Sequence, residues 1–211
     1  MATAGYFISL EGLEGVGKTT NREFIEQYLT DAGMEVVVTR EPGGTELGEQ
    51  LRSLLLHTNA TVSAETELMM MAASRKQHVD TLIAPALASG KWVLCDRFAD
   101  ASFAYQGGGR ELGLDVVDEL HQLMNITLKP EMTFLLDMPV ADGMARMNER
   151  GEPDRIEKET LTFFDRARDA YLALASKHPE RIKIIDAAQS INNVQAQIAV
   201  HLEQLVRRFH G

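Results

Sequence analysis

The chain has 211 residues, of which 45% are hydrophobic and 25% charged, and its formal net charge is −10. This composition is typical of a globular protein with one substantial core, and the longest apolar runs fall well short of the ~18 residues that cross a membrane. The acidic balance argues against the broad basic surface of proteins that bind nucleic acid polymers. We therefore expect one domain over residues 1–211, cytoplasmic, with no signal peptide and no membrane partner.

The single cysteine excludes an intramolecular disulfide bond. Cys95 lies at the end of the apolar segment 92–95, which predicts a small buried side chain and fits a reducing compartment. The six histidines are scattered without the spacing of metal ligands, so the sequence predicts neither a zinc site nor a catalytic histidine.

The predicted elements alternate between strands and helices. Apolar runs predict strands at 6–10, 35–39, 92–95, 132–136 and 181–185, and helical periodicity predicts helices at 18–32, 46–56, 64–88, 141–147, 158–177 and 192–208. This order predicts the α/β class, with a five-stranded parallel sheet covered by helices on both faces. The segments near Asn59, Gly107 and Gly151 are predicted to be functional or mobile loops.

One motif is especially informative: the segment GLEGVGKT at residues 12–19, between the first predicted strand and the first helix. In such a loop, glycines let backbone N–H groups converge on phosphate oxygens. Lys18 would reach the β- and γ-phosphates, and the Thr19 hydroxyl would bind Mg²⁺. The predicted nucleoside triphosphate site consists of Gly12, Leu13, Glu14, Gly15, Val16, Gly17, Lys18, Thr19 and Thr20.

Polar residues also follow the second and third predicted strands. Arg40 begins the segment REPGG, and Asp96 and Arg97 end the third strand. In open α/β sheets, ligands bind beyond the carboxyl ends of the strands, so these residues are expected to converge with the phosphate loop. Asp96 suits the acid that holds the water shell of the metal, and Arg97 suits a forked contact with phosphate.

Four motifs in this order and spacing, GLEGVGKTT, REPGGT, DRF and YQGGGR, resemble bacterial thymidylate kinase, a P-loop nucleoside monophosphate kinase family. The resemblance extends from residue 6 to about 208. It implies a P-loop NTPase fold with a short mobile lid at about 146–157, and a homodimer. It also implies transfer of the γ-phosphoryl group of ATP to dTMP, giving dTDP and ADP for dTTP biosynthesis, with Mg²⁺ required.

The resemblance bears on the positive charge at the transferring phosphoryl group. Some family members carry a phosphate-loop arginine where this chain has Gly15, so here the charge must come from other residues besides Lys18 and Arg97. The lid supplies candidates. We favour Arg150 and Arg155 as catalytic groups, and Arg146 as a residue that stacks beside adenine.

Glu14 is an unusual anion among phosphate-binding amides. It would repel the ligand unless it accepted a hydrogen bond, and the resemblance places it near the acceptor sugar, where a 3′-hydroxyl or a lid residue would satisfy it. Glu157 is expected to act with it near the metal. The predicted metal ligands are thus Thr19, Asp96 and Glu157.

The resemblance also implies a site for the acceptor nucleotide. Arg40, Arg75 and Arg97 would clamp its phosphate, and Met71 stands where the family usually places an aromatic residue that stacks on thymine. Hydrogen bonds from Ser102 and Gln106 would read the base, and Arg75 would also point at a thymine carbonyl. Tyr105 would pack under the sugar. With Glu14, these residues form the predicted dTMP site, and the three glycines at 107–109 predict a tight turn or a flexible tip beside it.

Two alternatives use the same phosphate loop. A deoxynucleoside kinase would lack a clamp for an acceptor phosphate, and the three arginines speak against it. A nucleotide-operated switch protein would carry Asp-x-x-Gly after the metal-binding strand, but Arg97, Phe98 and Ala99 follow Asp96 here.

Overall fold

The computed structural model of the protein describes residues 5–148 and 153–210. The predicted loop at Gly151 and the lid arginine Arg150 lie outside these ranges. Within them, no helix combines the length and apolar character that crossing a membrane requires.

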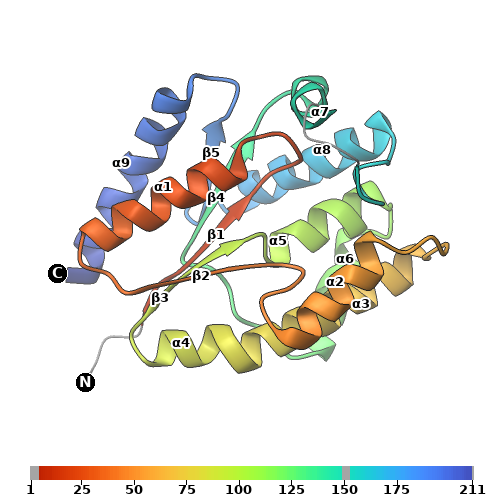
Figure 1. Ribbon diagram of the computed structural model, residues 1–211, viewed down its shortest axis with the longest axis horizontal. Coiled ribbons are helices and arrows are strands. Elements are labelled where there is room, and N and C mark those ends of the chain that lie inside the picture. Colours follow the sequence, from red (N-terminus) through yellow and green to blue (C-terminus); the bar gives the residue numbers. More distant parts are fainter. Residues whose placement is uncertain (1–4, 149–152, 211) are drawn as a thin grey trace.

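The expected five-stranded parallel sheet is confirmed (Figure 1). Its order is β2-β3-β1-β4-β5, so β1 lies at the centre and the chain turns from one half of the sheet to the other beside it. Such a switch point is where open α/β sheets bind ligands, because the loops on either side diverge there. The strands are β1 (Phe7–Glu11), β2 (Val36–Arg40), β3 (Trp92–Asp96), β4 (Met132–Asp137) and β5 (Ile182–Asp186).

The helices lie on both faces of the sheet, as expected (Figure 1). Their bounds are α1 (Lys18–Asp31), α2 (Glu46–Leu56), α3 (Ala64–His78), α4 (Ala84–Ala88), α5 (Ala99–Ser102), α6 (Leu114–Leu123), α7 (Val140–Asn148), α8 (Leu161–Lys177) and α9 (Ile191–His210), with π-helical segments η1 (Val79–Ile83) and η2 (Phe103–Gly109). Side chains of Thr45, Ser63 and Thr160 accept backbone N–H groups at the starts of α2, α3 and α8. These caps satisfy amides that a helix start leaves without partners.

Strand β1 is apolar on both sides and therefore needs cover on both. Ile8 and Leu10 belong to the core that includes Ile25 and Leu29 of α1, whereas Phe7 packs with Ile83 in a second cluster under α4. Alternation of side chains along the strand sends neighbours to opposite faces. The sheet is thus buried between helix layers, and its carboxyl edge carries the polar loops.

The single helix predicted at 64–88 is present as α3, η1 and α4 in direct succession. Pro85, near the start of α4, has no N–H to donate to the carbonyl four residues earlier, and its ring crowds that turn. A wider π turn just before it accommodates the proline without ending the helix.

The prediction of a loop or tight turn at Gly107 is wrong, because residues 99–109 form α5 and η2. The glycines are instead needed for close packing: a Cβ on Gly108 would stand 2.7 Å from Ala170 Cβ and 2.9 Å from the Arg166 carbonyl oxygen of α8. Helix α6, which follows, was also not predicted. The segment therefore packs as a rigid wall beside the site instead of forming a flexible tip.

We expect Gly108→Ala to destabilise the protein by roughly 1–3 kcal/mol, because its Cβ would meet the backbone of α8. For a chain of this size the melting temperature should fall by roughly 2–10 °C. Gly107→Ala is the matched control, since its nearest new contact is the flexible end of Leu114. Equal melting temperatures for the two variants would contradict close packing as the reason for Gly108.

Candidate active site

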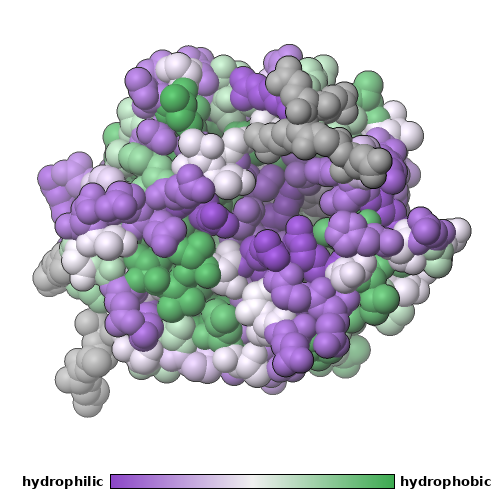
Figure 2. All heavy atoms as spheres, viewed as in Figure 1, coloured by the Kyte–Doolittle hydropathy of each residue, from purple (hydrophilic) through white to green (hydrophobic). Residues whose placement is uncertain are grey.

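A cavity of about 420 Å³ lies beyond the carboxyl ends of β1, β2 and β3. Figure 2 shows this face of the molecule hollowed near its middle, with hydrophilic side chains around the hollow. Phosphate-loop residues line one side and residues of α2, α3 and η2 line the other. The predicted site residues that line it are Glu14, Gly15, Val16, Gly17, Lys18, Thr19, Arg40, Met71, Asp96, Arg97, Tyr105, Gln106 and Glu157.

The remaining predicted residues lie elsewhere. Gly12, Leu13, Thr20, Arg75, Ser102, Arg146 and Arg155 are not among the residues that line this cavity. Gly12 and Leu13 still take part in the loop through their carbonyl oxygens, which accept hydrogen bonds from Lys18 Nζ at 3.2 and 2.6 Å. Arg146 is exposed, and its guanidinium donates to the Ala187 carbonyl oxygen at 3.5 Å.

Gly15 leaves no room for a side chain in the phosphate loop. Its φ is +72°, and a Cβ there would stand 1.9 Å from the carbonyl oxygen of Gly143 in α7. The approach of α7 to the loop therefore requires glycine. An arginine at this position would need α7 to move, so positive charge must reach the phosphates from other elements.

Arg97 adopts a left-handed backbone conformation, with φ of +68°. A non-glycine residue held there costs roughly 1–3 kcal/mol, so the surrounding contacts must hold it in place. The Arg97 N–H donates to the Leu10 carbonyl oxygen, and the Arg97 carbonyl oxygen accepts from the buried Cys95 thiol at 2.9 Å. The predicted burial of Cys95 is thus confirmed. The turn sends the guanidinium back under the phosphate loop.

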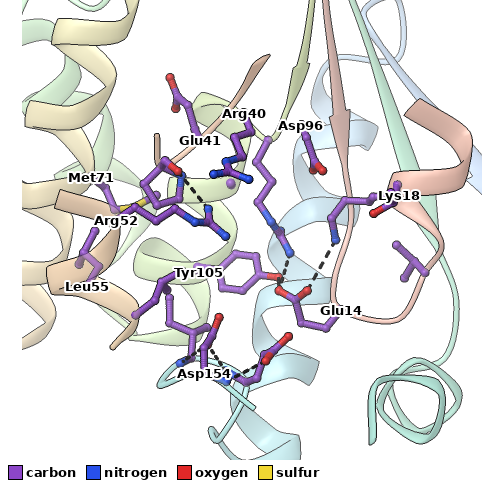
Figure 3. A pocket seen from close by; sticks show the side chains of 18 of the residues that line it. Glu14, Lys18, Arg40, Glu41, Arg52, Leu55, Met71, Asp96, Tyr105 and Asp154 are labelled. Atoms are coloured by element: carbon purple, nitrogen blue, oxygen red, sulfur yellow. Dashed lines mark hydrogen bonds and ion pairs between the residues drawn. The ribbon is translucent and has the colours of Figure 1, made fainter. Parts of the chain in front are cut away.

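The Arg97 guanidinium lies between the phosphate loop and Tyr105. It donates to the Gly12 carbonyl oxygen at 2.8 Å and to Glu14 Oε1 at 2.5 Å, and it stacks 4.8 Å from the centre of the Tyr105 ring. Figure 3 shows Glu14 facing both Lys18 and Tyr105 across the cavity. One carboxylate therefore joins three groups that the sequence assigned to two different substrates.

The charge of Glu14 is well compensated. Burial alone would raise its pKa, but the positive charges of Arg97 and Lys18 and a hydrogen bond from Tyr105 outweigh burial and lower the pKa to about 2. Lys18 Nζ lies 3.8 Å from Glu14 Oε2. Glu14 is thus ionised and can only accept hydrogen bonds, which resolves the repulsion expected from an anion in this loop.

Arg75 lies fully inside the protein, behind the cavity wall. Its guanidinium donates to Glu41 Oε2 at 2.7 Å, Ser102 Oγ at 2.9 Å, the Phe98 carbonyl oxygen at 3.0 Å and His121 Nε2 at 2.9 Å. Because a guanidinium only donates, His121 must accept at Nε2. Burial and the charge of Arg75 lower the pKa of His121 to about 3, so it is neutral. Two predicted base readers, Arg75 and Ser102, are therefore bonded to each other and not placed at the cavity.

Two arginines on the cavity wall were missed by sequence reasoning. Arg52 of α2 donates to the Pro42 carbonyl oxygen at 3.0 Å and points toward the same space as Arg40 in Figure 3. Arg22 lines the cavity one helical turn after Lys18, and its Nε is buried without a hydrogen-bond partner among the described residues. Neither lies in a recognisable motif. The only available signal was their spacing along helices that start at the site.

Glu11, at the end of β1, was also missed. It is fully buried, and burial, with repulsion from Asp100, raises its pKa to about 8. It accepts the Phe98 N–H and the Tyr171 hydroxyl, both at 2.7 Å. Glu11 thus anchors the chain directly after Arg97. A charged residue that ends an apolar strand was the sequence signal.

Residues 153–157 of the predicted lid fold onto α2 and α3. Asp154 and Glu157 form a compact turn, in which Asp154 N–H donates to Glu157 Oε2 at 2.8 Å. Asp154, Ile156 and Glu157 line the cavity, whereas Arg155 points away and donates to the Leu55 carbonyl oxygen at 2.7 Å and to Glu67 Oε2 at 2.6 Å. In this arrangement Arg155 therefore holds the lid segment and does not reach the phosphate loop.

Met71 forms part of an apolar wall opposite the charged groups. It is buried and packs with Leu55 and Leu56 of α2, with Ile156 of the lid against them. Gln106 and Tyr105 of η2 border the same space. A flat apolar group between these side chains would contact Met71 on one face.

Comparison with known proteins gives a consistent result. Residues 10–198 match the family described as thymidylate kinase. The thymidylate kinase of Nitrosospira multiformis is 49% identical over 194 residues, 92% of this chain and 95% of the relative, and that of Pseudomonas putida strain GB-1 is 47% identical over 99% and 100%. The crystal structure of the Ehrlichia chaffeensis thymidylate kinase has a TM-score of 0.78 at 32% identity, over 95% of this chain and 99% of that one.

The predicted resemblance and P-loop NTPase fold are thereby confirmed, and the chain belongs to the thymidylate kinase family.

Proposed function

We propose that the protein is an ATP:dTMP phosphotransferase that transfers the γ-phosphoryl group of ATP to dTMP and releases ADP and dTDP. One observation carries this proposal beyond family membership: the phosphate loop and a second set of cations, Arg40, Arg52 and Arg97, line one cavity. A donor triphosphate and an acceptor monophosphate both need such cations, and phosphoryl transfer requires mainly that the two are positioned together.

The acceptor phosphate is proposed to bind between Arg97 and Arg40. Arg97 already lies beside the phosphate loop, and its fork can turn from the Gly12 carbonyl to phosphate oxygens. Arg40 is half exposed and paired with Glu49 at 2.9 Å, an arrangement that can rearrange at low cost. Glu14 would then accept the 3′-hydroxyl of the sugar, since Lys18 and Arg97 keep it ionised.

The base is proposed to enter the apolar end of the cavity. Met71 contacts one of its faces through dispersion, and Gln106 reaches its polar edge. Tyr105 lies under the sugar and excludes a 2′-hydroxyl by its bulk. Arg75 and Ser102 support this wall from behind, where Arg75 joins Glu41, His121 and α5 to α3.

Mg²⁺ is proposed to arrive with ATP and to neutralise charge on the transferring phosphoryl group. Thr19, Asp96 and Glu157 line the cavity with oxygen atoms, the ligand type that Mg²⁺ prefers. In the described part of the chain, no three acidic, histidine or cysteine side chains form a metal site by themselves. This fits a metal held largely by substrate phosphates and water.

The lid arginines Arg150 and Arg155 remain proposed catalytic groups that reach the transferring phosphoryl group on closure, with Arg146 beside adenine. For Arg155 this requires breaking its bonds to Glu67 and Leu55. We also propose a cytoplasmic homodimer. Exposed apolar side chains on the neighbouring helices α2, α3 and α6 support the dimer, namely Leu47, Leu54, Met69, Val116 and Leu123.

The direct test is a coupled ADP-release assay with Mg-ATP and equal concentrations of dTMP, dUMP, dGMP, CMP or thymidine. We expect fast turnover with dTMP, because the cavity offers cations for an acceptor phosphate and an apolar wall for the base. Faster turnover with thymidine would indicate a nucleoside kinase. ADP release that does not depend on an acceptor would indicate a switch protein.

Arg97→Ala should raise the KM for dTMP roughly tenfold to a hundredfold, because charge-assisted hydrogen bonds to phosphate are lost. The KM for ATP should change much less. Arg97→Lys keeps the charge but lacks the forked guanidinium, so its KM for dTMP should lie between those of the wild type and Arg97→Ala. Steady-state kinetics on variants with unchanged circular dichroism spectra measure this, and equal increases in both KM values would refute the role of Arg97 in binding the acceptor.

Met71→Phe should tighten dTMP binding by roughly threefold to tenfold, since an aromatic ring adds about 0.5–1.5 kcal/mol of stacking to the apolar wall. Isothermal titration calorimetry gives the affinity. Met70→Phe is the control, because Met70 lies on the same helix and does not line the cavity. Unchanged or weaker binding by Met71→Phe would mean that the wall is already packed around methionine.

A further inference from the structure

Glu67 is a fully buried carboxylate on α3 that lies behind the wall formed by Gln106. Its Oε1 accepts from Gln106 Nε2 at 2.9 Å and from Arg110 Nε at 3.2 Å. Its Oε2 accepts from Arg110 Nη2 at 3.0 Å and Arg155 Nη2 at 2.6 Å. Both oxygens thus accept hydrogen bonds, and each keeps Arg110 as a donor if Arg155 moves away.

The two arginines keep this carboxylate ionised. Burial alone would raise its pKa, but the hydrogen bonds from Arg110, Gln106 and Arg155 outweigh burial and lower it. An ionised carboxylate has no proton to donate, so it can only accept. Gln106 must therefore present its NH₂ group to Glu67, and the reverse orientation of the amide would place two acceptors against each other.

The other end of the Gln106 amide is left without a partner. Its Oε1 is buried and makes no hydrogen bond to any of the described residues, although Gln106 lines the cavity. A buried carbonyl oxygen without a donor is unfavourable, so a ligand that supplies an N–H at this point binds more tightly than one that does not. Thymine supplies such a donor at N3, whereas a cytosine ring has a lone pair there.

We propose that Glu67 is a positioning residue for base specificity: by accepting the NH₂ group of Gln106, it fixes the Gln106 carbonyl oxygen as an acceptor for the N3–H of the base. The inference rests on the proposed function. It extends that function because it assigns discrimination between imide and amidine pyrimidines to a residue that does not line the cavity.

The experiment compares dTMP with 5-methyl-dCMP, which keeps the methyl group, sugar and phosphate and changes only the hydrogen-bonding pattern at N3 and position 4. In Glu67→Gln, the new amide can either accept from or donate to Gln106. The side-chain amide of Gln106 is then free to flip and exchange the positions of its oxygen and nitrogen. We expect the ratio of kcat/KM for dTMP over 5-methyl-dCMP to fall roughly tenfold, with the KM for ATP unchanged.

Glu159→Gln is the matched control. It removes the same charge from the same arginine, since Glu159 pairs with Arg110 at 2.5 Å, and it leaves Gln106 untouched. The ratio of kcat/KM for dTMP over 5-methyl-dCMP in this variant should equal that of the wild type. An unchanged ratio in Glu67→Gln, or an equal fall in Glu159→Gln, would overturn the proposal.

The exchanged variant Glu67→Gln/Gln106→Glu gives a rescue test. There, the amide at position 67 donates to the carboxylate at position 106, whose second oxygen again faces the base as an acceptor, so the ratio should return to within about threefold of the wild type. Failure of this rescue in a folded enzyme would contradict a role in hydrogen-bond polarity.

A crystal structure of the wild type with dTMP keeps the proposal falsifiable if Glu67→Gln fails to fold. Gln106 should keep one amide atom within hydrogen-bond distance of Glu67 and place the other on N3; an amide turned away from Glu67 would refute the proposal. Turnover of dTMP by the wild type tests the proposed function separately. Absent turnover would contradict the proposed function, whereas normal turnover with an unchanged specificity ratio in Glu67→Gln would contradict only the role of Glu67.

Discussion

The partly buried ion pair between Arg97 and Glu14 determines how the site is built. An arginine and a carboxylate taken out of water are costly unless each finds opposite charge and hydrogen bonds. Here the cost is met on both sides: Glu14 accepts from Arg97 and Tyr105 and lies near Lys18, and Arg97 also donates to Gly12. The phosphate loop, the end of β3 and helix η2 are thereby held in one geometry before any substrate arrives.

That geometry depends on rigid support behind the cavity. The backbone turn at Arg97 is unfavourable by itself, and it persists because Glu11, Cys95 and the Leu10 carbonyl hold the chain on both sides of it. Helix η2 packs so closely on α8 that Gly108 and Gly109 leave no room for a side chain. Catalysis by positioning alone requires such support, because small displacements of the cations weaken their contacts with the phosphoryl group.

A second buried network connects the cavity wall to the predicted lid segment. Glu41 holds Arg75 and His78, while Glu67 holds Gln106, Arg110 and Arg155. Glu41 joins α3 to the end of β2, and Glu67 joins α3 to η2 and to the predicted lid segment, which fixes the relative positions of these elements. The charged groups of this network are paired, and buried networks with paired charges favour one arrangement of the elements that they join.

Much of the fold and part of the site followed from the sequence, because the signals were local. Strand and helix positions came from periodicity, and the phosphate loop came from residue types at fixed spacing, since each backbone amide there has to reach a phosphate oxygen. Convergence of Arg40, Asp96 and Arg97 on that loop followed from parallel strands ending at one edge.

The tertiary structure alone decided which side chains face the cavity and which bond to other parts of the protein. Arg75, Ser102 and Arg155 were read as substrate contacts but are bonded within the protein, while Arg22, Arg52 and Glu67 gave no motif. Hydrogen-bond partners such as Glu67 and Gln106 lie 39 positions apart in the chain, and no local spacing records that contact.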